Sequence, residues 1–108
     1  MVLCFDRDLL HYGYRREPRL RCVWNQEAPA RAVPEADWLY AYSIHHRALS
    51  HELVRAVHAL GKGVMTFTVD TPRDLKRVLA MGVNGVMAND PERLAEALAA
   101  KTREDGRQ

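Results

Sequence analysis

Short β-branched and aromatic runs alternate with capped helical segments along almost the whole chain. The clearest run covers residues 64–69 and leads directly into Asp70-Thr71-Pro72. A run of this composition favours a strand. Threonine is a common helix N-cap, and proline is common at the first helical position. Strands that alternate with helices pair in parallel through right-handed crossovers, so the pattern predicts an α/β fold.

The same criteria predict about five strands and four or five helices. Strands are expected at residues 1–5, 19–26, 38–42, 64–69 and 83–88. Helices are expected after the capping residues Asp6, Ser50, Thr71 and Asp90, with Gly13 and Pro18 bounding the first of them. Residues 28–35 contain two prolines and are predicted to form a loop. The strict alternation in residues 19–26 predicts a strand with one buried face.

Charge and hydropathy limit the classes of partner. The formal net charge is only +2, which gives no electrostatic reason to expect a nucleic-acid or membrane partner. No apolar run approaches the roughly 20 residues of a membrane-spanning helix, and Asp6 interrupts the first run too early for a secretory leader. We therefore expect a cytoplasmic protein. Cys4 and Cys22 match no metal or redox spacing and are expected to be buried thiols.

The length of 108 residues corresponds to one domain. Residues 1–100 hold every predicted element, whereas residues 101–108 are polar and are expected to form a disordered tail. Periodicity alone leaves two architectures open. One is a piece of a closed barrel of parallel strands, and the other is a small flavodoxin-like sheet, with helices on both faces, that acts as a non-catalytic binding module.

Three segments carry a resemblance to a known family. Residues 79–91 read Leu-Ala-Met-Gly-Val-Asn-Gly-Val-Met-Ala-Asn-Asp-Pro, residues 66–70 read Thr-Phe-Thr-Val-Asp, and residues 2–6 read Val-Leu-Cys-Phe-Asp. The first is similar to a closing segment that is commonly Gly-Val-Asp-Gly-Ile-Ile-Thr-Asp-x-Pro. The second resembles a strand that usually reads Trp-Thr-Val-Asn, and the third an earlier strand that often ends Ser-Phe. These are features of glycerophosphodiester phosphodiesterases, and the chain resembles the carboxyl-terminal portion of that family.

The resemblance implies a partial (β/α)8 TIM-type barrel made of about the last five strand–helix units, because a complete barrel typically needs about 250 residues. It also implies a hydrolase that converts glycerophosphodiesters to glycerol 3-phosphate and an alcohol, in lipid metabolism. In the complete family barrel a divalent cation, Mg²⁺ or Ca²⁺, polarises the phosphate while two histidines perform acid–base work.

The matched segments lie outside the family's His-Arg-Gly, Glu-x-Asp and Glu-x-Lys motifs, which the resemblance places in earlier units. His46-Arg47 is followed by Ala48 and belongs to a different segment. No catalytic or metal-binding residue is therefore assigned, no cofactor is expected on this chain alone, and the chain is expected to be inactive by itself. A partial barrel also exposes two sheet edges and its inner face. The expected partners are a glycerophosphodiester, once the barrel is completed, and either a second copy or a complementing amino-terminal half.

Phe67, Asp70 and Phe5 are the candidate substrate-pocket residues. Phe67 stands where the family often has tryptophan, so it keeps an apolar wall but lacks the indole N–H donor. Phe5 ends a predicted strand and Asp70 follows one, and active sites of such barrels form at the carboxyl ends of the strands. The structural alternatives are a core position for the two aromatic rings and a capping role for the carboxylate.

The spacing of the histidines gives little support for a metal site. His51 and His58 lie on the same predicted helix, opposite its apolar positions. They are nearly two turns apart, which is too far for joint chelation of one ion. We interpret both as members of a solvated helix face.

Overall fold

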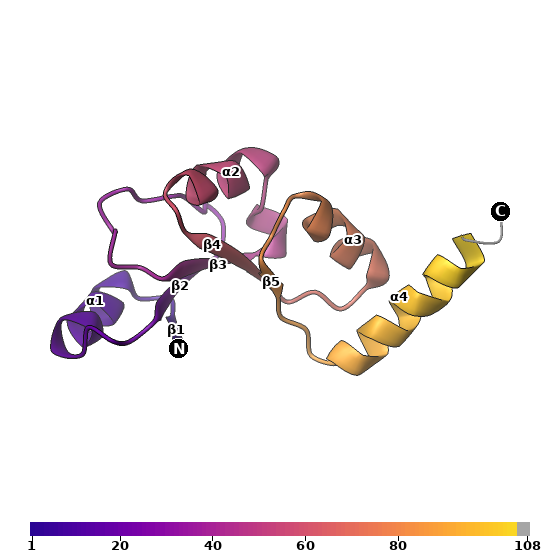
Figure 1. The fold of residues 1–108 in the computed structure, drawn as a ribbon, viewed down its shortest axis with the longest axis horizontal. Helices are drawn as coiled ribbons and strands as arrows, with labels where there is room; N and C mark the ends of the chain where they lie inside the picture. The colour runs from indigo at the N-terminus through magenta and orange to yellow at the C-terminus, as the bar shows by residue number, and fades with distance from the viewer. Residues whose placement is uncertain (106–108) are drawn as a thin grey trace.

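The computed structural model describes residues 1–105, and side chains for residues 1–100. Five parallel strands form one sheet in consecutive order (Figure 1). They are β1 (Val2–Cys4), β2 (Cys22–Gln26), β3 (Ala41–His45), β4 (Gly63–Phe67) and β5 (Gly85–Val86). The helices are α1 (Arg7–Arg16), α2 (His51–Ala59), α3 (Pro72–Ala80) and α4 (Pro91–Asp105), with a short 3-10 helix η1 (His46–Ala48) after β3.

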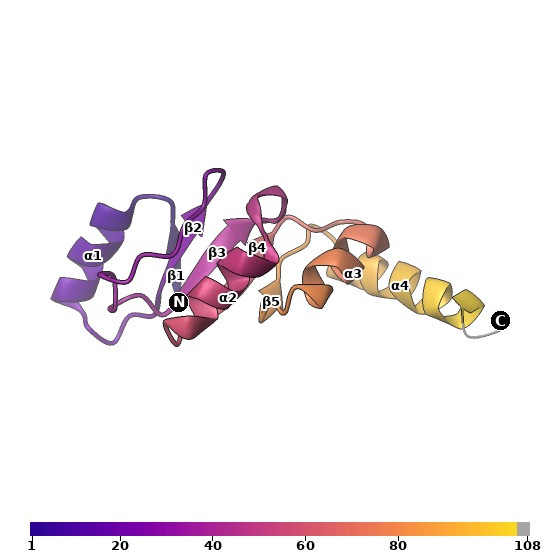
Figure 2. The same cartoon turned by 90° about the horizontal axis from the view of Figure 1, so that it is seen from above.

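The strand order decides between the two architectures. In a flavodoxin-like sheet the order of the strands reverses at the first strand, and this reversal places helices on both faces. Here every crossover moves one strand in the same direction, so right-handed connections leave the helices on one face, as in a barrel wall. The Cα radius of gyration is 15.5 Å, against about 13 Å for a compact domain of this length. The consecutive strand order makes the sheet an open arc, a partial barrel, with α2 lying over the strands in the view from above (Figure 2), and the flavodoxin-like alternative is wrong.

The expected caps are in place. The Asp6 side chain accepts hydrogen bonds from the N–H groups of the first turn of α1, and Ser50 and Thr71 do the same for α2 and α3. Pro72 begins α3, and Pro91 begins α4. Local sequence thus sets where each helix starts, because these residues satisfy N–H groups that have no partner within the helix.

Three predicted boundaries differ from the structure. The first helix continues through Gly13 to Arg16, since one glycine costs a helix only about 1 kcal/mol. The strand expected at 38–42 lies at Ala41–His45, because Leu39 instead packs into the core from the preceding loop. The strand expected at 19–26 begins at Cys22, and its neighbour Val23 is buried as well, so both faces of the strand are covered.

A loop covers the sheet where a helix would normally lie. Residues 27–40 connect β2 to β3 without a helix, and Val33, Ala36 and Leu39 fill the core from this segment. The Gln26 side chain donates to the Arg31 carbonyl at 2.8 Å and accepts from its N–H at 2.9 Å. These bonds fix the loop on the sheet, and the predicted loop at 28–35 is confirmed.

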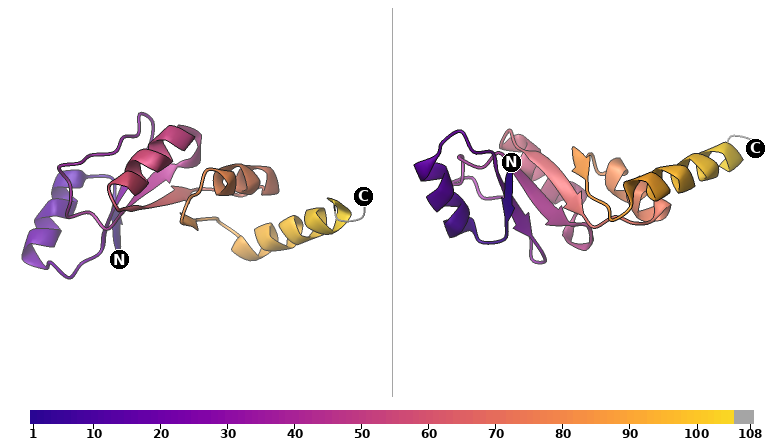
Figure 3. Two further views of the ribbon diagram at one scale, coloured as in Figure 1. Left: turned by 45° about the horizontal axis from the view of Figure 1, so that its top comes forward. Right: turned by 90° about the horizontal axis from the view of Figure 1, so that it is seen from below.

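The carboxyl-terminal helix extends away from the sheet (Figure 3). It continues to Asp105, so its last residues occupy the first part of the segment expected to be a tail, and residues 106–108 lie outside the described residues. Within residues 1–105, no helix combines the length and the apolar character that a membrane span requires.

Candidate functional site

Strand register sorts the side chains into a helix-facing layer and an inner layer. Tyr42 and Ile44 of β3 belong to the core that packs under the helices. Because successive side chains of a strand point to opposite faces, Ser43 and His45 point to the inner side of the arc. Pairing carries this assignment to the neighbouring strands: Asn25 pairs with Ser43, and Phe67 pairs with His45.

Two of the predicted pocket residues meet at the carboxyl-end rim of this inner face. The rings of Phe5, which follows β1, and Phe67, which ends β4, are in edge-to-face contact with centroids 6.0 Å apart. His45 contacts Phe67 in the same manner at 5.5 Å. Phe5 is 56% exposed, so the contact lies at the open end of the arc. The structure therefore assembles an aromatic surface at the rim where barrel active sites form.

The position of the His45 ring is fixed by the turn that follows β3. Its Nδ1 accepts a hydrogen bond from the Arg47 N–H at 3.2 Å, and the ring stacks on His46 at 4.8 Å between centroids. An accepting Nδ1 requires that the proton of the neutral imidazole sit on Nε2. His45 can therefore present an N–H donor at the rim, which the two phenylalanines cannot.

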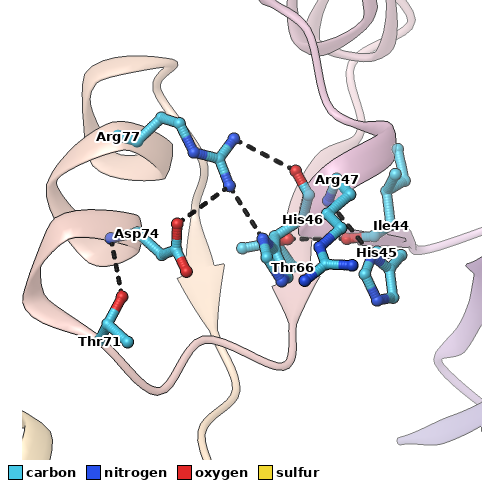
Figure 4. Close-up of polar contacts among 8 residues, drawn as sticks. All are labelled: Ile44, His45, His46, Arg47, Thr66, Thr71, Asp74 and Arg77. Carbon is cyan, nitrogen blue, oxygen red and sulfur yellow. Dashed lines mark hydrogen bonds and ion pairs between the residues drawn. The ribbon is translucent and has the colours of Figure 1, made fainter.

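An arginine of α3 also contacts the turn that follows β3 (Figure 4). The Arg77 guanidinium donates to His46 Nδ1 at 2.8 Å and to the His46 carbonyl at 3.3 Å, and lies 3.7 Å from the Asp74 carboxylate. Burial lowers the pKa of His46, and the neighbouring His45 acts in the same direction. A neutral imidazole suits this geometry, because guanidinium can only donate and Nδ1 must accept.

Beneath the rim, the inner face is less open than expected. The side chains of Val23, Ala41 and Ser43 point inward and are all buried. The expectation that the inner face of the arc is exposed is therefore wrong at its centre, because the curved sheet brings neighbouring inward side chains together. Two polar atoms in this layer, Asn25 Oδ1 and Ser43 Oγ, are buried without a hydrogen-bond partner. They mark the one place among the described residues where buried side-chain polar atoms lack a partner.

Asp70 does not join the two phenylalanines. Its carboxylate accepts from the backbone N–H of Asn89 at 3.0 Å and from its side-chain amide at 3.1 Å. Asp70 thereby ties the loop after β4 to the loop after β5. It also lines a hollow of about 410 Å³ at the amino-terminal ends of α3 and α4, together with residues that include Thr71, Asp90 and Arg93.

Sequence reasoning did not place His45 at the rim, and it overlooked one carboxylate pair. A strand placed at 38–42 leaves His45 outside the sheet. The inward direction of its side chain therefore could not be predicted. Glu35 and Asp37 have the Glu-x-Asp spacing, but they flank the buried Ala36 in the loop that packs with the helix-facing core. They therefore lie on the helix side of the sheet, where Glu35 lines a hollow together with Arg7 and Asp8 at the start of α1. His51 and His58 are both exposed on α2, as expected for a solvated helix face, and His58 Nε2 also lies 2.8 Å from the Asn84 side-chain oxygen.

The residues do not fit a divalent cation. Among the described residues, no three histidine, cysteine, aspartate or glutamate side chains lie close enough to hold a metal ion together. The two carboxylates nearest the strand ends have other bonds, since Asp6 caps α1 and Asp70 binds Asn89. The rim thus offers aromatic surface and an imidazole N–H, which can pack against and orient a ligand.

Comparison with known proteins identifies a family and relatives to which this chain is similar. A model of the glycerophosphoryl diester phosphodiesterase family matches residues 3–93. Glycerophosphodiester phosphodiesterase GDPD4 of Arabidopsis thaliana is 36% identical over 66 residues, which amount to 58% of this chain and 20% of that protein. The chain thus spans about a fifth of the length of this curated relative.

Solved structures show the same partial coverage. A protein from Silicibacter pomeroyi described as a glycerophosphoryl diester phosphodiesterase superposes with a TM-score of 0.79 at 26% identity, over 92% of this chain and 37% of its own. An Oleispira antarctica phosphodiesterase, solved in complex with the product sn-glycerol-3-phosphate, gives a TM-score of 0.78 at 19% identity, over 90% of this chain and 40% of its own. The described arc therefore corresponds to less than half of either chain.

Proposed function

Because this chain belongs to the glycerophosphoryl diester phosphodiesterase family, we propose that it forms the substrate-side wall of a phosphodiesterase barrel and is inactive alone. The whole barrel would hydrolyse a glycerophosphodiester to glycerol 3-phosphate and an alcohol. In support, the Oleispira antarctica structure, which shares this fold, holds sn-glycerol-3-phosphate. The observation that carries the proposal is the convergence of Phe5 and Phe67 at the carboxyl-end rim.

The chain's own residues would bind and orient the substrate. The two phenyl rings offer an apolar wall for the carbon skeleton of a glycerol or alcohol moiety. The Nε2–H of His45 offers a donor for an oxygen of the substrate at the same rim. Asp70 would act on the substrate only through the loop that it holds, since its carboxylate already accepts two hydrogen bonds.

The reacting groups would come from additional strand–helix units. A divalent cation, when bound there, polarises the phosphate of such a substrate. No cluster among the described residues can hold that cation, so we assign no metal ligand to this chain. Proton transfer to the leaving alcohol is likewise not assigned to any residue of the arc.

The first test measures the chain alone. Purified protein is incubated with glycerophosphocholine and Mg²⁺ or Ca²⁺, and glycerol 3-phosphate is quantified by an enzyme-coupled assay. We expect release no faster than in buffer with the metal alone. Robust, protein-dependent release would overturn the proposed division of labour between this arc and the additional strand–helix units.

The second test completes the barrel. The segment of the Silicibacter pomeroyi relative that this chain does not cover is fused ahead of Met1, and a folded chimaera is expected to hydrolyse the diester. Phe67→Ala should lower kcat/KM by about 10- to 100-fold, since burying a phenyl ring against substrate contributes about 1.5–3 kcal/mol. Phe67→Trp should retain activity, and Tyr40→Ala, at the opposite end of the strands, is the matched control. A folded chimaera without activity, or one indifferent to Phe67→Ala, contradicts the proposal.

A further inference from the structure

One arginine of the helix layer is bonded to the turn that follows β3. Arg77 lies in the last turn of α3, 31 positions away from His46 in the sequence. Its Nη2 atom donates to His46 Nδ1 at 2.8 Å, and its Nη1 atom donates to the His46 carbonyl at 3.3 Å (Figure 4). Because the N–H groups of a guanidinium form a rigid planar fork, these two bonds fix both the backbone and the ring of His46.

The arginine is itself held in place on α3. Its Nη2 atom lies 3.7 Å from an oxygen of the Asp74 carboxylate, one turn earlier in the helix, and both side chains are half-buried. The Asp74 N–H donates to the Thr71 hydroxyl at 3.1 Å, and Val78, which follows Arg77, is fully buried. The guanidinium therefore approaches the turn from a defined position.

The residue before His46 depends on this contact. The rings of His45 and His46 stack with centroids 4.8 Å apart and planes inclined by 20°. The buried Thr66 of β4 donates through its hydroxyl to the Ile44 carbonyl at 2.7 Å. The carbonyl groups of the residues before and after His45 are thus each bound by a side chain from another element. Its ring also lies against the ring that Arg77 binds.

The other face of this arrangement is the aromatic rim. The His45 ring contacts the Phe67 ring edge to face, with centroids 5.5 Å apart and planes inclined by 80°. His45 is therefore held between His46 and Phe67. A purely structural arginine would stabilise the fold without changing the direction of the His45 ring, so the direction of that ring distinguishes a positioning role from a structural one.

We propose that Arg77 is a positioning residue of the substrate site: through its two bonds to His46, it holds the His45 ring against Phe67 and so directs the Nε2–H donor to the rim. The effect of Arg77 on catalysis rests on the proposed function. The position of the His45 ring does not, because every contact from Arg77 to Phe67 lies within this chain.

Proton NMR of the full chain at pH 8, where histidines of ordinary pKa are neutral, tests the position of the ring. In the wild type, nuclear Overhauser effects should join the ring protons of His45 and Phe67, because the edge-to-face contact brings them close together. Arg77→Met removes every donor but keeps the length and the helix propensity of the side chain. It should abolish most of these Overhauser effects and shift the His45 ring resonances towards those of an unstructured histidine.

Two further variants control the NMR experiment. Arg73→Met changes an exposed arginine one turn earlier on the same helix and should leave the His45 signals unchanged. Arg77→Lys keeps the charge and can make only one of the two bonds, so it should shift the same signals in the same direction by less. Unchanged His45 signals in folded Arg77→Met, or in Arg77→Lys where only that variant folds, overturn the proposal.

The chimaera described above tests the effect on substrate. Arg77→Met should raise KM about 2- to 10-fold with kcat nearly unchanged, the effect of losing one hydrogen bond to bound substrate. In a His45→Ala background the same substitution should have no further effect, because the ring that it positions is absent. An inactive chimaera contradicts the proposed function and leaves the NMR result to decide this inference. An active chimaera whose KM is unchanged by Arg77→Met, or rises equally with and without His45, overturns the inference.

Discussion

The rings of Phe5 and Phe67 are in edge-to-face contact, with centroids 6.0 Å apart, although β2 and β3 lie between their strands. In a flat sheet three strand spacings would separate the two positions by about 14 Å, and the side chains would stand parallel. Their convergence requires a sheet that curves around its inner face. The contact is therefore a direct expression of the barrel curvature, and it lies where the proposed substrate wall begins.

We expect the two phenylalanines to be energetically coupled. In a double-mutant cycle with Phe5→Ala and Phe67→Ala, urea unfolding should give a coupling free energy of about 0.5–1 kcal/mol, the usual contribution of an edge-to-face pair. A cycle between Phe67→Ala and Tyr12→Ala is the control, since Tyr12 lies on α1 and should show no coupling. A coupling of zero for the first pair would show that the rings do not meet in solution.

The His46–Arg77 contact should make stability depend on pH. Burial holds the pKa of His46 below its ordinary value in the folded state. As pH falls through the ordinary histidine range near 6.5, the unfolded chain takes up a proton before the folded chain does. The free energy of unfolding should therefore decrease from about pH 6.5 downward, until the folded-state pKa is passed.

His46→Asn isolates this effect, because the asparagine oxygen can still accept from Arg77 but does not titrate. Urea unfolding measured between pH 5 and 8 should show a weaker pH dependence for His46→Asn than for the wild type. His51→Asn, at an exposed position on α2, should keep the wild-type slope. Equal slopes for all three proteins would remove His46 as the source.

The Thr71 cap should stabilise α3 and with it the loop after β4. Its side-chain oxygen accepts from the Asp74 N–H at 3.1 Å. Thr71→Ala should lower the free energy of unfolding by about 1 kcal/mol, the typical cost of losing such a cap. Thr71→Ser retains the hydroxyl and should recover most of the loss. An alanine variant as stable as the wild type would mean that water replaces the cap at no cost.

Tyr42 should contribute to stability through its hydroxyl as well as its ring. The buried Tyr42 hydroxyl accepts from the Val33 N–H at 2.9 Å and donates to the Val33 carbonyl at 3.3 Å. Tyr42→Phe leaves that N–H without a partner in the core, which should cost about 1–3 kcal/mol in thermal or urea unfolding. Tyr40→Phe, at a ring that is 52% exposed, should change stability very little.

Helix starts could be predicted from the sequence because capping depends on residues close to one another in the chain. Asp6, Ser50 and Thr71 all cap the helices that follow them. The position of β3 could not be predicted this way. Its ambiguous aromatic segment is resolved only when Leu39 packs into the core from the loop, an interaction that depends on distant residues.

The site was predictable only in part for the same reason. The two phenylalanines could be placed at strand ends from local sequence, whereas the inward direction of His45 required the correct strand register. The buried pair Asn25 and Ser43 comes from strands far apart in sequence, and its pairing appears only in the folded sheet. Asp70 looked like a rim carboxylate because its partner Asn89 lies after the next strand.

The two hydrogen bonds by which the Gln26 side chain holds the loop before β3 involve only backbone atoms of residue 31. The identity of the side chain at that position is consequently free to drift during evolution, with a single exception. That exception is proline, which has no N–H to offer the glutamine oxygen and would therefore break one of the two bonds, while its carbonyl could still accept the other.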